Sequence, residues 1–457
     1  MPMTSQYTHN AIIARYIYSA CIITVTPDAR ILHDPWFTEG AYDGSWFQYP
    51  KIADPIKSIG EVDLIYVSHV HPDHYDSIFL KKYFAEYGVK EVIVADHATN
   101  HLVNKMRADG IAVTALRERR QIGNTTIEIV PHKTNSISDI DSAIIIKYFD
   151  GNREHCVVNT NDIIFDDAMI DALRRAVNEP DILFCGYTGA GPYPQTYFDF
   201  DDPKLLEEAG KKRLVFFDRY LRLSRAMNAK VNIPFAGKYI LGGKLAKLNA
   251  YRGVADAIEV MTIDPKALVL ADGGGEINTS DLKPTAVRTE RYSLADIQRR
   301  EDEICAHKMD YERLIDAQEI HQLPIKRLLV AAARRASGKS ECETDYFFVI
   351  SLPKNELAII NANKMPERLI RFAKNTSELP EPRSEIHIDP RYLFGLLANV
   401  YHWNNAEVGS QYNTRRTPNE LNRAAQSFLI TYQRNLERSG KWSRVLPSLD
   451  TPPALQL

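Results

Sequence analysis

Long hydrophobic runs are missing from this sequence of 457 residues. A helix that crosses a membrane needs about 20 consecutive apolar residues, and no run reaches that length. The first residues, MPMTSQYTHN, also lack the basic and apolar regions of a secretion signal. We therefore expect a protein without a membrane span and with a cytoplasmic location.

Cysteine is scarce as well, with five residues that are widely separated along the chain. An odd number at such spacing argues against a disulfide framework and against a Cys-x-x-Cys metal site. The segment Cys305-Ala-His307 could begin an iron–sulfur motif of the Rieske type, but no Cys-x-x-His follows it. The sequence therefore does not predict an iron–sulfur cluster.

An excess of charge of either sign is also absent, since the formal net charge is -3. This balance gives no electrostatic reason to expect nucleic acid or an anionic membrane as a partner. Apolar residues make up 44% and charged residues 25%, which is typical of a soluble globular protein. The length favours two domains. A turn-rich stretch at Thr262–Leu282 places their boundary at 1–275 and 276–457.

Histidine and aspartate gather in one short stretch, His69-Val-His71-Pro-Asp73-His74. It follows the apolar run Asp63–Val67, which predicts a buried strand. In extended backbone, residues two apart share a face, so His69 and His71 can point the same way. Pro72 then allows the chain to turn and to bring Asp73 and His74 in from another direction. We interpret the stretch as a metal site with room for two ions.

Other polar side chains also follow predicted strands, namely His132, Asp162 and Asp34. A single sheet whose strand ends share one edge would bring His132 and Asp162 to the motif. We expect Asp34 to orient a ligating imidazole, although an ordinary turn before Pro35 explains it equally well. One hypothesis gives His69, His71, His132 and Asp162 to one ion, and Asp73, His74 and Asp162 to a second.

Two loops have compositions that suggest contact with a substrate. Trp46 lies in an aromatic loop that can either wall a pocket or pack over a sheet edge. The glycine-rich segment from Gly186 to Tyr197 contains Tyr187 and Tyr193, which could stack on a ligand or hydrogen-bond to it. No helix is predicted directly after this segment, so it is not a nucleotide-binding fingerprint.

Residues 276–457 show a mixed pattern of helices and strands and no catalytic constellation of their own. We expect a compact α+β domain there. A lid over the site, a platform for a ligand and a contact between copies of the chain in a homo-oligomer all remain open for it.

The HxHxDH stretch, followed by His132 and Asp162, resembles the metallo-β-lactamase superfamily. Within it, ILHDPWF, AIIIKYF, FCGYTGAGPYPQTYF and IPFAGK are most similar to the group with CMP-N-acetylneuraminate hydroxylase and its lactonase and phospholipase relatives. The resemblance covers about residues 10 to 260 and implies an α/β fold, an αββα sandwich with a binuclear site at one sheet edge. Two departures stand out: no complete Rieske pattern, and no late histidine in Asn232–Gly237 for the second ion.

These residues leave three hypotheses for the function. The first is a hydrolase that uses metal-bound hydroxide on a phosphoester, lactone or amide of a small metabolite. The second is a non-haem iron oxygenase that acts on a sugar nucleotide or similar metabolite with an external reductant. The third is a metal-stabilised binding protein. The cofactor would be one or two divalent ions, zinc first, with iron and manganese as alternatives. If the second ion is absent, Asp73 and His74 would act as a general acid/base pair.

Overall fold

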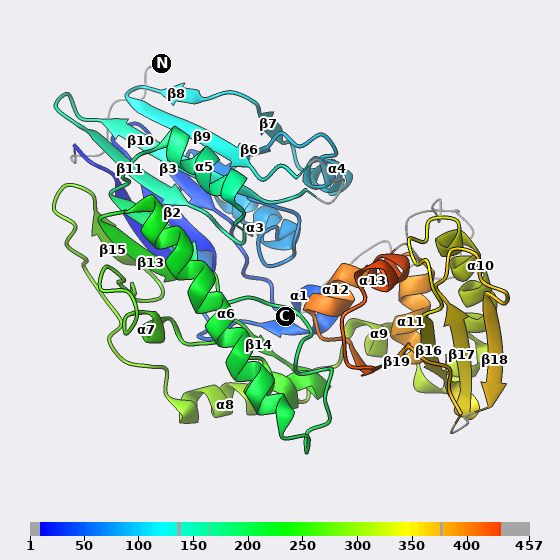
Figure 1. Ribbon diagram of the computed structural model, residues 1–457. Helices are drawn as coiled ribbons and strands as arrows, with labels where there is room; N and C mark the ends of the chain where they lie inside the picture. Colours follow the sequence, from blue (N-terminus) through cyan, green and yellow to red (C-terminus); the bar gives the residue numbers. More distant parts are fainter. Residues whose placement is uncertain (1–9, 135–138, 164, 375–377, 431–457) are drawn as a thin grey trace.

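The computed structural model describes residues 10–134, 139–163, 165–374 and 378–430. Figure 1 shows two parts that meet along one side, a larger part built from the first sheets and a smaller part built from the end of the chain. Residues 1–9 of the predicted first domain and 431–457 of the predicted second domain lie outside the described residues.

The first sheet has seven strands among the described residues. Across this sheet, the first three pairs of neighbouring strands are antiparallel, and the last three pairs are parallel. The order across the sheet is β15 (Gly275–Asn278), β1 (Ile13–Tyr18), β2 (Cys21–Val25), β3 (Arg30–His33), β5 (Leu64–Tyr66), β6 (Glu91–Ala95) and β7 (Thr114–Leu116).

The second sheet faces the first and has six strands in the described part of the chain. Its first three strands are parallel, and the remaining pairs are antiparallel. The order is β13 (Val231–Phe235), β12 (Ile182–Gly186), β11 (Glu154–Asn159), β10 (Ser142–Phe149), β9 (Thr125–Pro131) and β8 (Arg120–Ile122).

Alternation of side chains along the strands builds the layers. Leu64 and Tyr66 enter the apolar core between the two sheets, while Ile65 faces the opposite side of its sheet. That outer side is covered by α3 (Ser77–Tyr87) and α4 (His101–Ala108). The outer side of the second sheet is covered by α5 (Asp167–Ala176) and α6 (Lys204–Met227), the long green helix of Figure 1. The expected αββα sandwich is therefore confirmed.

Short elements connect the sandwich to the end of the chain. β4 pairs antiparallel with β14, and this small sheet lies beside η1. The bounds of these elements are α1 (Ala41–Gly44), β4 (Trp46–Phe47), α2 (Pro55–Ile59), β14 (Ile240–Leu241), η1 (Gly243–Tyr251) and α7 (Ala257–Val260).

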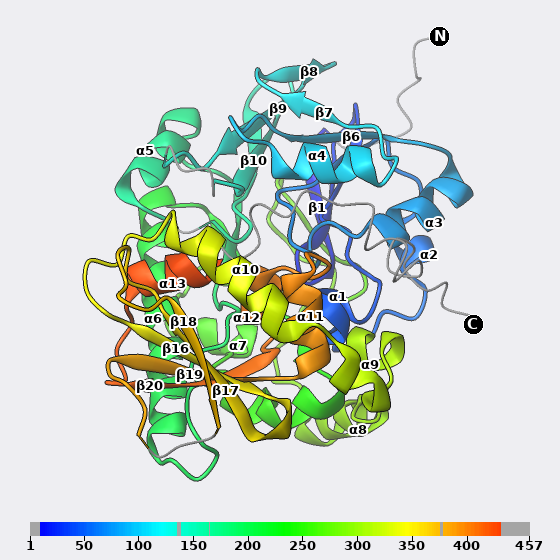
Figure 2. The same ribbon diagram turned by 90° about the vertical axis from the view of Figure 1, so that its right-hand side faces the viewer.

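The C-terminal part is α+β, as expected. Its five-stranded sheet has the order β18 (Ile370–Lys374), β17 (Glu356–Asn361), β16 (Phe347–Leu352), β19 (Arg383–Ile388) and β20 (Tyr412–Thr417). The helical elements around this sheet are α8 (Leu294–Ile304), α9 (Asp310–Leu314), η2 (Ala317–Gln322), α10 (Ile325–Ser337), η3 (Pro353–Asn355), α11 (Pro390–Leu397), α12 (Trp403–Val408) and α13 (Arg423–Ile430). Figure 2 shows α10 and α11 lying across this sheet.

The junction between the two parts differs from a simple linker. The division expected between residues 275 and 276 cuts through β15, which pairs with β1, so the first sheet continues to Asn278. One apolar cluster runs from the outer side of the first sheet into the helices and sheet of the C-terminal part. The two parts therefore share a buried contact. Within the described residues, no helix is long and apolar enough to cross a membrane.

Candidate metal centre

The histidine motif lies in the loop between β5 and α3, directly after the buried strand that the sequence predicts. After Pro72 the chain turns, and the backbone N–H groups of His74 and Tyr75 both donate to the carbonyl of His71. Asp76 then caps α3 by accepting from Phe79 N at 2.9 Å. A strand, a turn and a capped helix thus hold the motif on both sides.

Three donor groups converge here: His69, His74 and Asp162 each offer a ligand atom, and these atoms lie within 4.8 Å of one another. His74 Nε2 lies 3.4 Å from Asp162 Oδ2 and 3.5 Å from Asp73 Oδ2. His69 Nε2 lies 2.8 Å from Nδ1 of His71. We call His69, His71, Asp73, His74 and Asp162 the histidine–aspartate cluster.

Two sheets supply this cluster, so the expectation that one sheet brings these residues together is wrong. The motif follows β5 of the first sheet, whereas Asp162 follows β11 of the second. The sheets are joined beside the site by the hydroxyl of Tyr66, which lies 2.8 Å from Ser142 Oγ, and Ser142 Oγ donates to Ser68 O at 2.9 Å. The cluster therefore forms only when the sandwich is closed.

Asp34 lies where the sequence expectation puts it, at the end of β3 and beside the cluster. Its Oδ2 is 3.0 Å from His74 Nδ1, and its carboxylate accepts hydrogen bonds from the N–H and hydroxyl of Ser68, both at 2.7 Å. This contact holds the ring of His74 with Nε2 toward Asp73 and Asp162. Its effect on a bound metal stays a prediction.

Three residues that were not among the predicted site residues also touch the cluster. Tyr42, which has a left-handed backbone with φ of 56°, donates its hydroxyl to Asp73 Oδ1 at 2.5 Å. Asp141 Oδ1 lies 3.8 Å from His69 Nδ1. Asn404, from α12 of the C-terminal part, lies near enough to His71 to raise its pKa. The position of Asp141 directly before β10 was a signal of the same kind as the position of Asp162 after β11.

The charges of the cluster are poorly balanced. Burial lowers the pKa of His69 and His71, which favours the neutral imidazoles that metals bind. Burial also lowers the pKa of His74, but Asp162, Asp73 and Asp34 outweigh it and raise that pKa overall. Burial raises the pKa of Asp73, and it raises that of Asp141 to about 7 with help from Asp162.

The acids of this region have few cations near them. Among the described residues, the ion pairs of Asp34, Asp73, Asp141 and Asp162 are all with histidines. Buried carboxylates in apolar surroundings are costly unless a cation compensates them. A divalent ion with nitrogen and oxygen ligands fits this set of donors, so the residues present are compatible with the expected metal.

Other predicted site residues lie elsewhere. His132 Nε2 is 3.6 Å from Asp166 Oδ2 at the start of α5, has no hydrogen-bond partner in the described structure, and is not among the three convergent donors. Trp46 is only 3% exposed and stacks on Tyr239 with 3.3 Å between ring centroids. Tyr193 donates its hydroxyl to Glu208 of α6 at 2.5 Å. Their roles as ligand or substrate contacts stay predictions.

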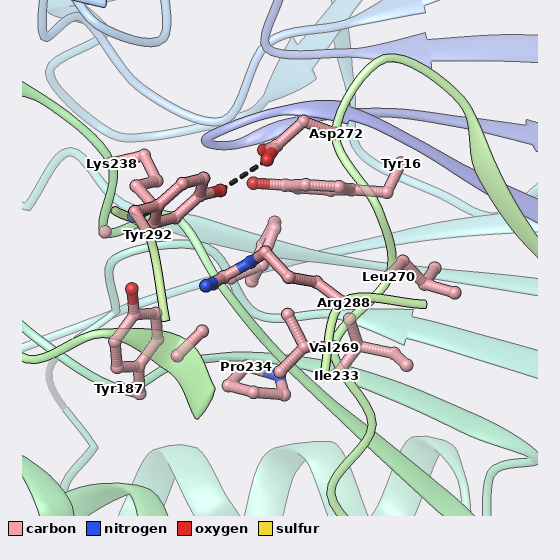
Figure 3. Close-up of a pocket in the computed structure, with 13 residues that line it drawn as sticks. Tyr16, Tyr187, Ile233, Pro234, Lys238, Val269, Leu270, Asp272, Arg288 and Tyr292 are labelled. Carbon is pink, nitrogen blue, oxygen red and sulfur yellow. Dashed lines mark hydrogen bonds between the residues drawn. The ribbon is translucent and has the colours of Figure 1, made fainter. Parts of the chain in front are cut away.

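Tyr187 lines a small cavity at the edge of the second sheet (Figure 3). In that view Arg288 lies between Tyr187 and Tyr292, and the hydroxyl of Tyr292 points to Asp272, to which it donates a hydrogen bond. The cavity measures about 10 Å³. Since a single water needs roughly this volume, a metabolite does not fit there as the cavity stands.

A larger cleft opens beside the histidine–aspartate cluster, with a volume of about 290 Å³. Both parts of the chain line it, with Tyr42, Val70 and Pro72 on one side and Asp310, Arg313 and Asn405 on the other. The C-terminal part therefore closes one wall of the space next to the cluster.

Comparisons with known proteins give partial matches. No protein-family model matches the sequence. The chain is 27% identical over 292 residues to the putative Rieske 2Fe-2S iron-sulfur protein of Mycobacterium tuberculosis H37Rv. This match covers 59% of the chain and 53% of the relative. It is 24% identical over 237 residues to gorilla cytidine monophosphate-N-acetylneuraminic acid hydroxylase, covering 49% of this chain and 37% of the relative.

Among solved structures, the isothiocyanate hydrolase from Delia radicum gut bacteria matches with a TM-score of 0.42 and 14% identity, over 58% of this chain and 98% of that one. The chain spans about half the length or less of the curated relatives it matches. With its two sheets between helical layers and the HxHxDH loop after β5, the N-terminal part has the αββα architecture that the resemblance to the metallo-β-lactamase superfamily implies.

Proposed function

We propose that this protein is a metal-dependent hydrolase of a small metabolite. The observation that carries the proposal is the meeting of His69, His74 and Asp162 from two sheets, with further buried carboxylates around them and no Lys or Arg ion pair to those carboxylates in the described residues. A bound divalent ion would supply a water of lowered pKa and would polarise a carbonyl or phosphoryl oxygen. A phosphoester, lactone or amide is the class of substrate that such chemistry attacks.

The residues of the chain would bind the metal ion and hold its ligands in position. His69, His74 and Asp162 are the ligands that the geometry favours, and His71 and Asp73 complete the set from the same loop. Asp34 holds His74, and Tyr42 holds Asp73. Fixed ligands keep the acceptor atoms oriented toward one point, which is what a metal site requires.

An iron oxygenase is the second candidate. Its support is the similarity to a hydroxylase and to a Rieske protein, together with a donor set that suits iron as well as zinc. Because no complete Rieske pattern occurs in the sequence, such an enzyme would need a reductant supplied by another protein.

The two candidates are separated by elemental analysis followed by activity measurement. For the hydrolase we expect about one or two zinc or manganese ions per chain and turnover of phosphodiester or lactone substrates without oxygen. Iron content with oxygen consumption under an added reductant would replace the hydrolase by the oxygenase. A bound metal with neither activity would favour a binding protein.

His69→Ala serves as the matched control for both assays. It removes a ligand and the contact of that ring with Ser68, while the hydrogen bonds of Ser68 to Asp34 and of Tyr42 to Asp73 do not involve His69. Metal and activity should be lost together in this variant. Activity that survives the loss of the metal would contradict the proposal.

A further inference from the structure

α1 is a short turn with an unfavourable backbone conformation. Its two central residues, Tyr42 and Asp43, are both left-handed, with φ of 56° and 64°. In this conformation the Cβ atom comes too close to the following carbonyl oxygen, so residues other than glycine adopt it rarely and mostly one at a time. A strained conformation of this kind persists only where the surrounding structure imposes it. The turn therefore needs support from other elements.

Gln411 of the C-terminal part gives this support. The residue precedes β20 and is 5% exposed. Its Nε2 donates to the carbonyl of Tyr42 at 3.0 Å and, over a longer distance of 3.5 Å, to the carbonyl of Asp43. Its Oε1 accepts from the hydroxyl of Tyr311 at 3.4 Å, which fixes the end of the amide that faces the turn. One amide group thus holds two consecutive carbonyls in the directions that left-handed residues give them.

Other contacts press the C-terminal part against the same turn. The hydroxyl of Tyr392 donates to Asp43 Oδ2 at 2.7 Å, and Ser45 Oγ donates to the carbonyl of Gly409 at 2.6 Å. Gly409 ends α12, which lies beside α1 in Figures 1 and 2. A Cβ atom on Gly409 would lie only 3.1 Å from Cβ of Tyr42, so the end of this helix packs directly on the turn.

The side chain of Tyr42 connects this turn to the histidine–aspartate cluster. Its hydroxyl donates to Asp73 Oδ1 at 2.5 Å, and the other oxygen of Asp73 lies 3.5 Å from His74 Nε2. Tyr42 is 2% and Asp73 is 7% exposed, so water does not replace this hydrogen bond. A change of φ at Tyr42 would swing its ring away from Asp73. The orientation of the carboxylate therefore depends on the left-handed turn.

We propose that Gln411 is a positioning residue of the metal centre, which holds the left-handed turn and thereby directs the hydroxyl of Tyr42 at Asp73. The inference rests on the metal binding that the proposed function requires, and not on hydrolysis. The C-terminal part is then more than one wall of the cleft. It supplies the amide group on which the orientation of a metal ligand depends.

Titration of the full chain with cobalt(II) tests this inference without a substrate. Cobalt(II) accepts the same nitrogen and oxygen ligands, and its visible absorption changes with the geometry around the ion. Tyr42→Phe removes the hydroxyl and should weaken cobalt binding by about 10- to 100-fold, as is usual for a group that orients a metal ligand. Gln411→Met keeps the length of the side chain without its donor. It should weaken binding by about three- to tenfold, the effect of one neutral hydrogen bond, and change the absorption as Tyr42→Phe does.

Gln195→Met is the matched control. Gln195 is another glutamine that is buried where the two parts meet, with 1% exposure. Its Nε2 donates to the carbonyl of Gly191 at 2.6 Å and to Ser410 Oγ at 3.0 Å. This variant loses the same donor beside the same segment of the C-terminal part. It should bind cobalt with the affinity and the absorption of the unaltered chain.

The double variant distinguishes positioning from a general loss of structure. If Gln411 acts through the hydroxyl of Tyr42, Gln411→Met weakens binding no further once Tyr42→Phe is present. Multiplied effects of the two changes would overturn the proposal. So would unchanged binding in Gln411→Met, equal weakening in Gln195→Met, or an unaltered chain that binds no cobalt.

Two further measurements keep the outcomes separate. If the melting curve shows that Gln411→Met does not fold, Tyr392→Phe takes its place, since it also removes a donor to the turn. Cobalt binding that follows the expected pattern in a chain that hydrolyses no phosphodiester or lactone would retain the positioning role and sink the proposed hydrolase. Hydrolysis by a chain in which Gln411→Met leaves cobalt binding unchanged would sink the positioning role alone.

Discussion

Two clusters of ionisable groups draw residues from the ends of parallel strands of the second sheet, since Asp162 follows β11 and Lys238 follows β13. The first is the histidine–aspartate cluster. The second, which we call the lysine–arginine cluster, consists of Lys238, Asp256, Asp272, Arg288 and Tyr292. They differ in how their charges are compensated.

The lysine–arginine cluster contains its own counter-charges. Arg288 binds Asp256 through two hydrogen bonds of 2.6 and 3.0 Å, and the hydroxyl of Tyr292 donates to Asp272. Lys238 Nζ lies 3.2 Å from the centre of the Tyr292 ring. Two cations thus face two acids around a cavity that holds about one water. Because the charges of the lysine–arginine cluster compensate one another, this cluster does not need a bound ion.

In the described part of the chain, the ion pairs of the acids in the histidine–aspartate cluster are all with histidines. A histidine can be neutral near physiological pH, so it compensates a carboxylate only while it holds a proton. The difference between the clusters teaches that burial of charge alone does not mark a metal site. What distinguishes the proposed metal site is that its acids pair with histidines and, within the described residues, with no Lys or Arg.

The largest effect is expected from His74→Ala in the histidine–aspartate cluster. It removes the ring that contacts Asp34, Asp73 and Asp162. We expect metal content to fall close to zero and kcat/KM by more than about 100-fold, beyond what residues outside the ligand set usually cost. Elemental analysis and a steady-state assay measure both. Full metal content in this variant would show that His74 is not needed for metal binding, and the histidine–aspartate cluster would then not differ from the lysine–arginine cluster in this respect.

Next in size is Arg288→Met in the lysine–arginine cluster. It leaves Asp256 partly buried without its bidentate partner. We expect the free energy of unfolding to fall by about 3 kcal/mol, since breaking a buried ion pair strands the other charge. Urea denaturation measures the loss. Metal content should be that of the unaltered chain, and a loss of metal would show that the two clusters are coupled.

Asp34→Asn and Asp272→Asn form a matched pair, one in contact with each cluster. Asp34 orients His74, so its amide variant should weaken metal affinity by about 10- to 100-fold. Asp272 pairs with Tyr292, so its amide variant should leave metal affinity as it is. Competition with a metal chelator measures both affinities. Equal metal affinities in the two variants would show that Asp34 does not position His74.

The smallest effect concerns Asp43, at the junction between the two parts of the chain. Its carboxylate accepts from the hydroxyl of Tyr392 at 2.7 Å, and burial raises its pKa from 3.8 to about 7. The folded state therefore holds a proton that the unfolded state releases above about pH 4, and its contribution to stability is lost as the pH rises through 7.

Asp43→Asn tests this pH dependence. Asparagine keeps the shape and tolerates the left-handed backbone, where φ is 64°. Between pH 5 and pH 8, we expect the unaltered chain to lose about 2 kcal/mol more stability than this variant. Thermal or urea unfolding at both pH values gives the difference. Identical slopes in the two proteins would contradict the raised pKa.

Much of the site could be predicted because its signals are local. The strand before His69, the turn after Pro72 and the strand-end positions of Asp34 and Asp162 all follow from patterns within a few residues. The position of Trp46 was harder to predict, since an aromatic loop can either line a pocket or pack against the core. Here it packs on Tyr239, a residue far away in the sequence.

By itself the sequence determined which donors a metal ion could find: a dense set of nitrogen and oxygen atoms after a buried strand, in an α/β chain without a Rieske pattern. Only the tertiary structure decided which donors meet. Alternation along a strand shows that a side chain faces a core, but not which strand lies across from it. For this reason the pairing of His74 with Asp162, the proximity of Asn404 to His71, and the position of Arg252 over Tyr239 appear only in the folded chain.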